Sequence, residues 1–393
     1  MQDPVVIAGM ARTPIGNFQG AFAGVPATQL GSHAIKAALA RSGVKPADVE
    51  EVYMGCVLPA GLGQAPARQA SLGAGLPTSA GCVTVNKVCG SGMKTLMMAH
   101  DAIAAGSIKV AVAGGMESMT NAPHILPTGR TGIKFGHGEI LDHMAFDGLE
   151  DAYKKRTAMG VFAEKCAREW QFSKTEQDEY AMRSVTRAQK AIKDGKFKDE
   201  IAPFEVATRK GPVLVADDEK PGTVDAAKIP SLKPAFEKDG TVTAGSSSAI
   251  SDGAAALIVM RESEAKKRGA RPIAKIVAHA THSQEPEWFT TAPVDSIKSV
   301  LAKAGWSVGE VDLFEINEAF AVVPMAAMRE LKIPAEKVNI HGGAIALGHP
   351  IGASGARIIV TLINALKETG GKRGVASLCI GGGEATSVAV ELV

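Results

Sequence analysis

Two cysteines and one histidine are the residues of this chain whose surroundings could support covalent chemistry. Cys89 follows a β-type run over residues 82–88 and precedes a helix-like run over 93–105. Free backbone N–H groups and the positive end of the helix dipole predict a lowered pKa for this thiol and a reactive nucleophile. A lone cysteine is more often a small core residue, so Cys89 needs partners before it counts as a site.

Two loop residues could be such partners. His349 lies between Gly348 and Pro350, just before a second helix-like run. A lone histidine is more often structural, but one fixed by these neighbours and placed opposite a helix-start cysteine is a plausible activating base. Asn317 follows the apolar run 311–316 and is either a turn residue or an amide that orients a water or a carbonyl oxygen.

Cys379 is the second thiol, and alone it would be assigned to the core. It follows the strand-like run 375–378, and the glycines after it leave backbone N–H groups, notably that of Gly381, free to form an oxyanion hole. One thiolate is enough for acyl transfer, whereas a second thiol acting as a base suggests proton abstraction from carbon next to a thioester carbonyl. The three residues together indicate a Claisen condensation through an acyl-enzyme.

The elements that must position these residues form a duplicated pattern. Strands alternate with helices of roughly 10–15 residues in the first part of the chain and again in the last, which favours a mostly parallel α/β sheet. Three short motifs recur in the same order: Ser42-Gly43 and Ala304-Gly305, Ser91-Gly92 and Ser354-Gly355, Gly114-Gly115 and Gly381-Gly382. The sequence therefore predicts two copies of one α/β unit, packed face to face.

The region between the two copies has a different composition. A loop rich in proline and glycine is followed by two charged helical segments, over 158–170 and 175–194. The strand-like run 254–260 then returns to the first copy. The expected division is an N-terminal half over 1–118 and 249–270, a loop domain over 119–248 that covers the core, and a C-terminal half over 271–393.

Composition excludes several classes of function. The chain has 393 residues, 46% of them hydrophobic, and a net charge of +2, so no global basic excess indicates nucleic acid or a membrane surface. Five scattered cysteines without a CxxC pair, and nine histidines without paired metal spacing, argue against disulfides and a catalytic metal. With no leader before the first strand and no apolar run of roughly 18 residues, we expect a cytoplasmic protein without a membrane span.

The complete set of motifs resembles the thiolase family over essentially the whole chain. The motifs that carry the resemblance are residues 86–92, 114–119, 317–320, 348–350 and 379–383. The resemblance implies an α/β protein of the thiolase fold, with two duplicated βαβαβαββ halves in a five-layer α-β-α-β-α sandwich and an inserted loop domain. It implies a short-chain enzyme of fatty acid metabolism that reversibly condenses two acetyl-CoA to acetoacetyl-CoA and CoA. A broader-range 3-ketoacyl-CoA thiolase of β-oxidation is the alternative.

The resemblance also implies a role for each candidate catalytic residue. Cys89 would be acylated after activation by His349, and Cys379 would deprotonate the second acyl-CoA. A water held by Asn317 would form one oxyanion hole together with His349. The backbone N–H groups of Cys89 and Gly381 would form the other.

Acyl-CoA binding is likewise expected from the resemblance. The positions that match family contacts, or lie near the acyl pocket, are Leu149, Met159, Lys220, Phe236, Ser248 and Phe320. Ala158 departs from the family, in which a histidine commonly touches the pantetheine, and Pro221 alters the loop near Lys220. Coenzyme A is expected as substrate and product, with no permanently bound cofactor. The family is commonly a homotetramer, with the loop 124–135 at the contact.

Two other classes of protein stay open on the sequence alone. A decarboxylating ketosynthase shares the duplicated fold, but it usually combines its cysteine with two histidines, or with histidine and asparagine, and Cys379 argues against it. A non-catalytic lipid- or sterol-carrier module should have lost one of the three reactive residues, and all three are present. Trp288 and Phe289 lie in a run that could shape the acyl pocket.

Overall fold

The first half of the molecule is built on five strands. The computed structural model describes residues 3–393. The strands are β1 (Val5–Arg12), β3 (Glu51–Gly55), β4 (Gly81–Val85), β5 (Val110–Ser118) and β10 (Ser251–Arg261), in the spatial order β4-β3-β5-β10-β1. Parallel ladders join β3 to β4 and β5, whereas β10 is antiparallel to both β5 and β1. The expected mostly parallel sheet is therefore corrected to a mixed one. Strands joined by a helical crossover are parallel neighbours, which is why a parallel sheet was expected. β10 instead follows the inserted segment and pairs antiparallel with both of its neighbours.

The second half repeats this order. Its strands are β11 (Ala274–Ser283), β12 (Leu313–Ile316), β13 (Arg373–Ile380) and β14 (Glu384–Leu392), in the order β12-β13-β14-β11. A parallel bridge from Phe314 to Val338 stands where β4 pairs with β3 in the first half. Antiparallel pairing of Val6 with Lys275 joins β1 to β11 and makes the two sheets continuous. The predicted duplication is confirmed by this matching strand order.

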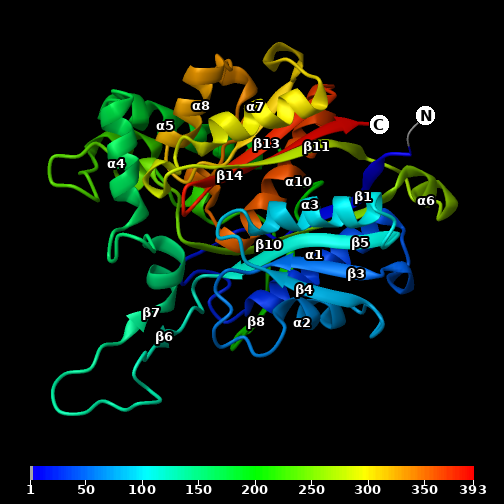
Figure 1. Ribbon diagram of the computed structural model, residues 1–393, viewed down its shortest axis with the longest axis horizontal. Coiled ribbons are helices and arrows are strands. Elements are labelled where there is room, and N and C mark those ends of the chain that lie inside the picture. Colours follow the sequence, from blue (N-terminus) through cyan, green and yellow to red (C-terminus); the bar gives the residue numbers. More distant parts are fainter. Residues whose placement is uncertain (1–2) are drawn as a thin grey trace.

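Helices form three layers around the two sheets (Figure 1). The outer helices of the first half are α1 (Ala27–Ser42) and α2 (Pro66–Gly73), and those of the second are α7 (Ala292–Ala304) and α8 (Val322–Leu331). Between the sheets lie α3 (Ser91–Ala104) and α10 (Ile351–Thr369). The two central helices touch at glycines, because a Cβ on Gly355 would come within 2.3 Å of the Met93 nitrogen. The repeated Ser-Gly motif thus allows the five-layer packing.

The segment between β5 and β10 lies over one end of this core. Its main helices are α4 (Met159–Glu169) and α5 (Lys174–Lys193), within one residue or so of their expected positions. Ser173 begins α5 with a capping box that involves Glu176. Between β6 (His124–Ile125) and β7 (Leu141–Asp142) the chain forms an arm that projects from the body of the molecule (Figure 1). We propose that the loop domain spans 119–248, as the sequence predicts.

The remaining elements are short. They are the strands β2 (Gly16–Asn17), β8 (Phe204–Thr208) and β9 (Gly211–Val215), the helices α6 (Glu262–Lys267) and α9 (Ala344–Leu347), a π-type turn at Ala145–Leu149, and 3-10 turns at Pro46–Asp48, Lys220–Gly222, Ala226–Ser231, Ala244–Ser246, Pro286–Trp288, Val308–Glu310 and Ala335–Lys337. Among the described helices, none combines the length and apolar character needed to cross a membrane.

Candidate active site

The turn that carries Cys89 joins β4 to α3 and is held in a strained conformation. Val88 has a φ of 44°, which is unusual for a β-branched residue. Three hydrogen bonds fix it: the Val88 N–H donates to Asn86 Oδ1 at 2.9 Å, the Ser91 hydroxyl donates to the Val88 carbonyl at 2.6 Å, and the Lys87 N–H donates to Ser91 Oγ at 2.8 Å. The polar residues around Cys89 therefore set the direction of its side chain.

The environment of Cys89 overturns the expected lowered pKa. Burial raises the pKa of its thiol to about 11, although the N–H groups of Gly381 and of Cys89 itself partly oppose the effect. The first residue of α3 is Ser91, so the cysteine stands before the helix rather than in its first turn. The carboxylate of Glu117 raises the Cys89 pKa further. At rest, the sulfur is therefore a neutral thiol next to two backbone N–H donors.

His349 is buried and held in one tautomer. Its Nδ1 lies 2.6 Å from Ser354 Oγ, and the Ser354 hydroxyl donates to the Pro350 carbonyl at 3.0 Å. Because that hydroxyl proton is already used, Ser354 accepts from the Nδ1–H and leaves Nε2 unprotonated. Burial, followed by the charge of Arg357, lowers the pKa of His349 to about 3. The ring is therefore neutral, with Nε2 available as a base. Sequence reasoning used Ser354 only as a marker of the repeat, and its place in the helical turn after His349 is the signal that could have identified it.

Cys379 and Asn317 lie behind the wall of the site. Cys379 is fully buried near the end of β13, and burial, followed by the nearby Cys89, raises the pKa of its thiol well above the usual range. The Asn317 amide nitrogen lies 3.5 Å from both ring nitrogens of His349. Among the described residues the Asn317 Oδ1 has no partner. The backbone N–H of Asn317 donates to the Ser377 carbonyl at 2.9 Å, which ties this loop to β13.

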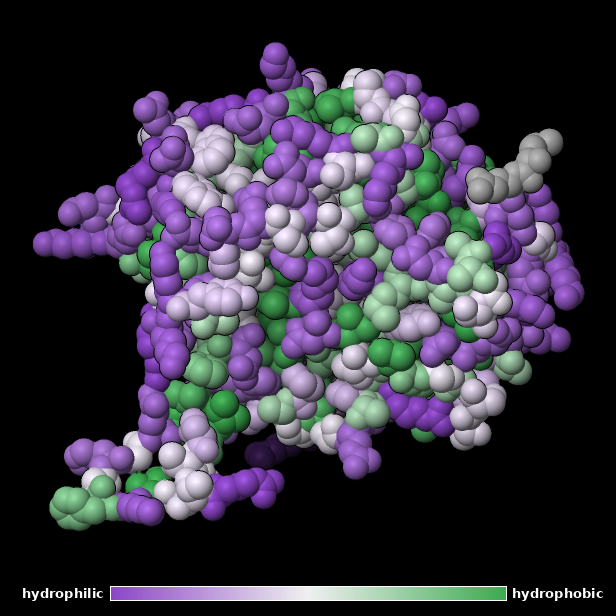
Figure 2. Space-filling view, viewed as in Figure 1, coloured by the Kyte–Doolittle hydropathy of each residue, from purple (hydrophilic) through white to green (hydrophobic). Residues whose placement is uncertain are grey.

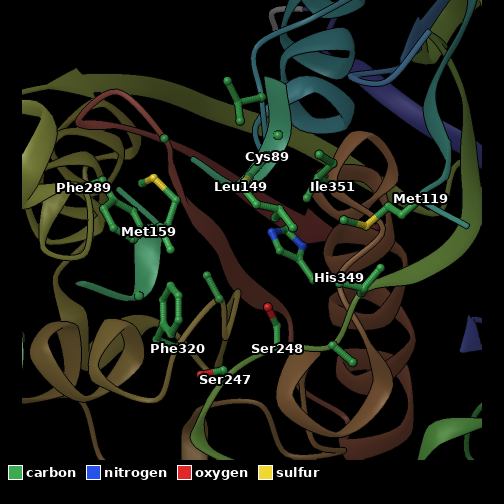
Figure 3. A pocket seen from close by; sticks show the side chains of 18 of the residues that line it. Cys89, Met119, Leu149, Met159, Ser247, Ser248, Phe289, Phe320, His349 and Ile351 are labelled. Atoms are coloured by element: carbon green, nitrogen blue, oxygen red, sulfur yellow. The ribbon is translucent and has the colours of Figure 1, made fainter. Parts of the chain in front are cut away.

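These residues meet at an apolar cavity of about 300 Å³ (Figure 3). The lining includes most of the predicted residues: Cys89, His349, Gly381, Leu149, Met159, Phe236, Ser248 and Phe320. Further lining side chains that the sequence did not single out are Met119, Ser247, Ile250 and Ile351. Phe289 lines the cavity, as its sequence position suggested, and its neighbour Trp288 does not. Ala158 is also part of the wall.

Lys220 is placed differently from the other predicted contacts. Its ammonium group donates to the Ile345 carbonyl at 2.6 Å, and burial lowers the pKa of this amine to about 8. It lines two neighbouring cavities instead of the one at Cys89. One of these also borders Phe236 and Ser248, so Lys220 lies near the outer part of the site.

The raised pKa of Cys89 predicts how this residue reacts with iodoacetamide. Since the thiolate is the reacting form, alkylation should accelerate about tenfold per pH unit between pH 7.5 and 9.5. Brief labelling followed by quantitative mass spectrometry of the Cys89 peptide measures the rate. A rate that is already at its plateau at pH 7 would mean that a thiolate exists at rest and would contradict the neutral pair described here.

The duplicated α/β core, with a cysteine and a neutral histidine before its two central helices, defines the thiolase-like class of acyltransferases. Family models match residues 5–263 as "Thiolase, N-terminal domain" and 270–392 as "Thiolase, C-terminal domain". "Acetyl-CoA acetyltransferase 2" of Arabidopsis thaliana is 51% identical over 99% of this chain and 97% of its own length. "Acetyl-CoA acetyltransferase" of Rhizobium meliloti (strain 1021) is 48% identical over 100% of both chains. The crystal structure of the Bacillus anthracis acetyl-CoA acetyltransferase superimposes with a TM-score of 0.96 at 40% identity, covering 100% of this chain and 99% of that one. The chain belongs to the thiolase family.

Proposed function

We propose that this protein is an acetyl-CoA C-acetyltransferase that condenses two acetyl-CoA to acetoacetyl-CoA and CoA, and catalyses the reverse thiolysis. One observation carries the proposal. Cys89, His349 and Gly381 line the same apolar cavity, with Nε2 of His349 free to act as a base and the Gly381 N–H directed at the Cys89 sulfur. Cys379 is buried behind this cavity. The names of the relatives favour acetyl-CoA over longer substrates. Matches to both thiolase models argue against the ketosynthase alternative. The presence of Cys89, His349 and Cys379 argues against the carrier alternative.

The first half-reaction moves an acetyl group to Cys89. His349 Nε2 takes the proton of the thiol as the sulfur attacks the thioester carbonyl. The backbone N–H groups of Cys89 and Gly381 stabilise the oxyanion, as their direction toward the sulfur allows. The CoA thiolate leaves and takes a proton from the Cys379 thiol. The products are acetyl-Cys89, free CoA, an imidazolium at His349 and a thiolate at Cys379.

The second half-reaction uses the two charges that the first one leaves. The Cys379 thiolate removes an α-proton from the second acetyl-CoA, and the Nε2–H of His349, with a water held by Asn317, stabilises the enolate oxygen. The enolate carbon attacks acetyl-Cys89, and the Cys89 sulfur leaves with the proton from His349. The enzyme returns to two neutral thiols and a neutral ring, which is the resting state favoured by burial of all three groups.

The acyl-CoA is proposed to enter through two adjoining cavities. A second cavity of about 470 Å³ shares Val88, Met159 and Gly381 with the first. Its charged lining residues are the basic Lys155 and Arg156 and the acidic Asp147, Glu150 and Asp151. Of these, Lys155 and Arg156 can pair with the phosphates of CoA, whereas the apolar inner cavity suits pantetheine and a short acyl group. Coenzyme A is thus substrate and product, with no permanently bound cofactor proposed.

A substrate series tests the proposed function directly. Thiolysis kcat/KM for 3-ketoacyl-CoA from C4 to C10 should be highest at C4 and fall as the chain lengthens. When acetyl-CoA is the only substrate, the protein should also release CoA. Equal or higher kcat/KM at C8 and C10 would replace the proposal with the broader-range thiolase of β-oxidation, and no CoA release would remove the enzyme assignment.

Ala158→His is expected to tighten CoA binding without changing the chemistry. Ala158 lines the cavity but has no polar atom to offer the pantetheine, and a histidine could add one hydrogen bond. One bond of this kind corresponds to a fall in KM of about tenfold or less. Steady-state thiolysis kinetics measure the change. A large change in kcat at saturating substrate would show that this position does more than bind.

We further propose a homotetramer assembled through the projecting arm. The arm exposes several large apolar side chains: Leu126, Ile133, Phe135 and Ile140. It stands away from the body of the molecule in the space-filling view, with apolar residues near its tip (Figure 2). Such side chains favour burial against another chain. A cytoplasmic location and a part in fatty acid metabolism stay predictions from the sequence.

A further inference from the structure

The last turn of α3 and the middle of β11 bring together three metal-ligand side chains that the proposed reaction does not use. His100 and Asp101 come from α3, and His279 comes from β11, 178 positions after Asp101. The His279 Nε2 lies 3.2 Å from His100 Nδ1 and 2.8 Å from Asp101 Oδ1, and His100 Nδ1 lies 3.0 Å from the same oxygen. The three atoms therefore surround a single point.

Hydrogen bonds alone do not explain this convergence well. Each neutral imidazole has one N–H, so if both rings donate to the carboxylate oxygen, two donor nitrogens face each other at 3.2 Å. A cation at the shared point would instead accept all three lone pairs. In a tetrahedral site with bonds of about 2.0–2.1 Å, ligand atoms are separated by roughly 3.3 Å. The observed separations are shorter than this by about half an ångström at most.

We propose that His100, Asp101 and His279 form a binding site for a divalent transition-metal ion, best suited to Zn²⁺, with the fourth position open to water. Imidazole nitrogens and one carboxylate are a preferred donor set for such ions, and hard cations such as Mg²⁺ are disfavoured by the two nitrogens. Asp101 is the most exposed ligand, with 59% of its side chain accessible, so an ion can reach the site from solvent.

The surroundings are compatible with a bound cation. The three ligand atoms lie within 4.8 Å of one another, close enough to share one ion. Asp101 supplies a negative charge at the shared point. The ammonium group of Lys303 is engaged elsewhere on the same strand, where it donates to the backbone carbonyl of His279 at 3.0 Å.

The ion would connect the two halves of the molecule. Its ligands lie on α3, which belongs to the first half, and on β11, which belongs to the second (Figure 1). With a rise of 1.5 Å per residue, the site is roughly 14 Å along α3 from the turn that carries Cys89. The expected effect of the metal is therefore on stability and not on the chemistry at Cys89.

Cobalt titration of the full-length protein tests the site. Accessible cysteines are first alkylated with iodoacetamide, so that no thiol contributes, and Co²⁺ is then added while the visible absorption of tetrahedral Co²⁺ is recorded. One equivalent should bind, and competition with Zn²⁺ should remove the signal. His279→Ala and His100→Ala should each weaken binding by about 10–100-fold or more.

His282→Ala is the matched control. It is on the same strand, three residues on, and its ring lies 3.8 Å from Asp295, a His–Asp pair without a third ligand. Binding should be unchanged in this variant, and Zn²⁺ should raise the Tm of the unmodified wild type but not that of His279→Ala. Thiolase activity of each variant before alkylation reports that it is folded. Unchanged Co²⁺ affinity in His279→Ala, equal loss in His282→Ala, or no tetrahedral signal would each overturn the proposal.

Discussion

Cys379→Ser is expected to leave a protein that becomes acetylated at Cys89 but makes almost no acetoacetyl-CoA. Acetyl transfer needs the base at His349 and the N–H groups near the sulfur, and both stay in place. The variant lacks the thiol that gives a proton to the leaving CoA, but the CoA thiolate can take one from solvent, so this step slows and still occurs. Condensation needs an α-proton to be removed, and a serine hydroxyl is a much weaker base than a thiolate. Loss of a positioned base lowers the rate by about 10²–10⁴-fold. Mass spectrometry of the Cys89 peptide measures the first step, and acetoacetyl-CoA formation measures the second.

Two further variants make this experiment decisive. Cys89→Ser should neither carry an acetyl group nor form product, whereas Cys82→Ser, a change at a partly exposed thiol on β4, should do both at the wild-type rate. If Cys379→Ser blocks acetylation as completely as Cys89→Ser does, the proposed division between nucleophile and base is wrong. Cys379 would then be essential for the first step, and not only the donor of a proton to the leaving CoA.

His349→Ala is expected to lower the rate of Cys89 acetylation by about 10²–10⁴-fold, because no other described group offers a free ring nitrogen at the cavity. Ser354→Ala keeps the ring but removes the acceptor that holds the Nδ1–H. Acetylation by this variant should slow by only about tenfold, roughly one hydrogen bond's worth, because part of the histidine population adopts the wrong tautomer. Rapid-quench measurement of acetyl-Cys89 in the wild type and both variants distinguishes loss of the base from loss of its correct tautomer. Equal losses in both variants would show that Ser354 does more than hold the ring.

The lowered pKa of His349 adds a pH test. With a pKa of about 3 the ring is already neutral at pH 5, so acetylation in the wild type should show no step near pH 6.5. A step there would contradict the neutral resting pair. The unfolded chain binds a proton at this residue below roughly pH 6.5, and the folded protein does so only near pH 3. This residue therefore lowers the stability of the fold as the pH falls through that window.

Much of the fold and the reactive residues could be predicted because they leave local signals. Each reactive residue lies next to a sequence pattern that predicts a turn. These patterns are the strand-to-helix turn at Cys89, the glycines after Cys379 and the Gly-His-Pro sequence around His349. Glycine can also lie inside a strand: β5 runs through Gly114 and Gly115 to Ser118. A Cβ on Gly114 would lie 2.2 Å from the Ala255 carbonyl, so these glycines permit close packing inside the strand.

Properties that depend on distant partners could not be predicted from sequence. The thiol pKa of Cys89 is set by burial in a cavity assembled from both halves and the insertion, and this outweighs the nearby helix start. Lys220 turns toward the Ile345 carbonyl, which only the folded chain brings close. The cluster of His100, Asp101 and His279 leaves no recognisable motif in the sequence, because His279 lies 178 positions after Asp101, in the other half of the chain.

The position of β10 in the first sheet has a consequence during synthesis. β10 lies between β5 and β1, so two strands of the first half keep open edges until Arg261 has left the ribosome. At 5–20 residues per second, the roughly 140 residues after β5 take about 7–30 s to make. During that time the apolar edges of β1 and β5 are available to other nascent chains. A truncated chain that ends before β10 should therefore associate with chaperones or aggregate, whereas one that ends shortly after Arg261 should expose far less strand edge.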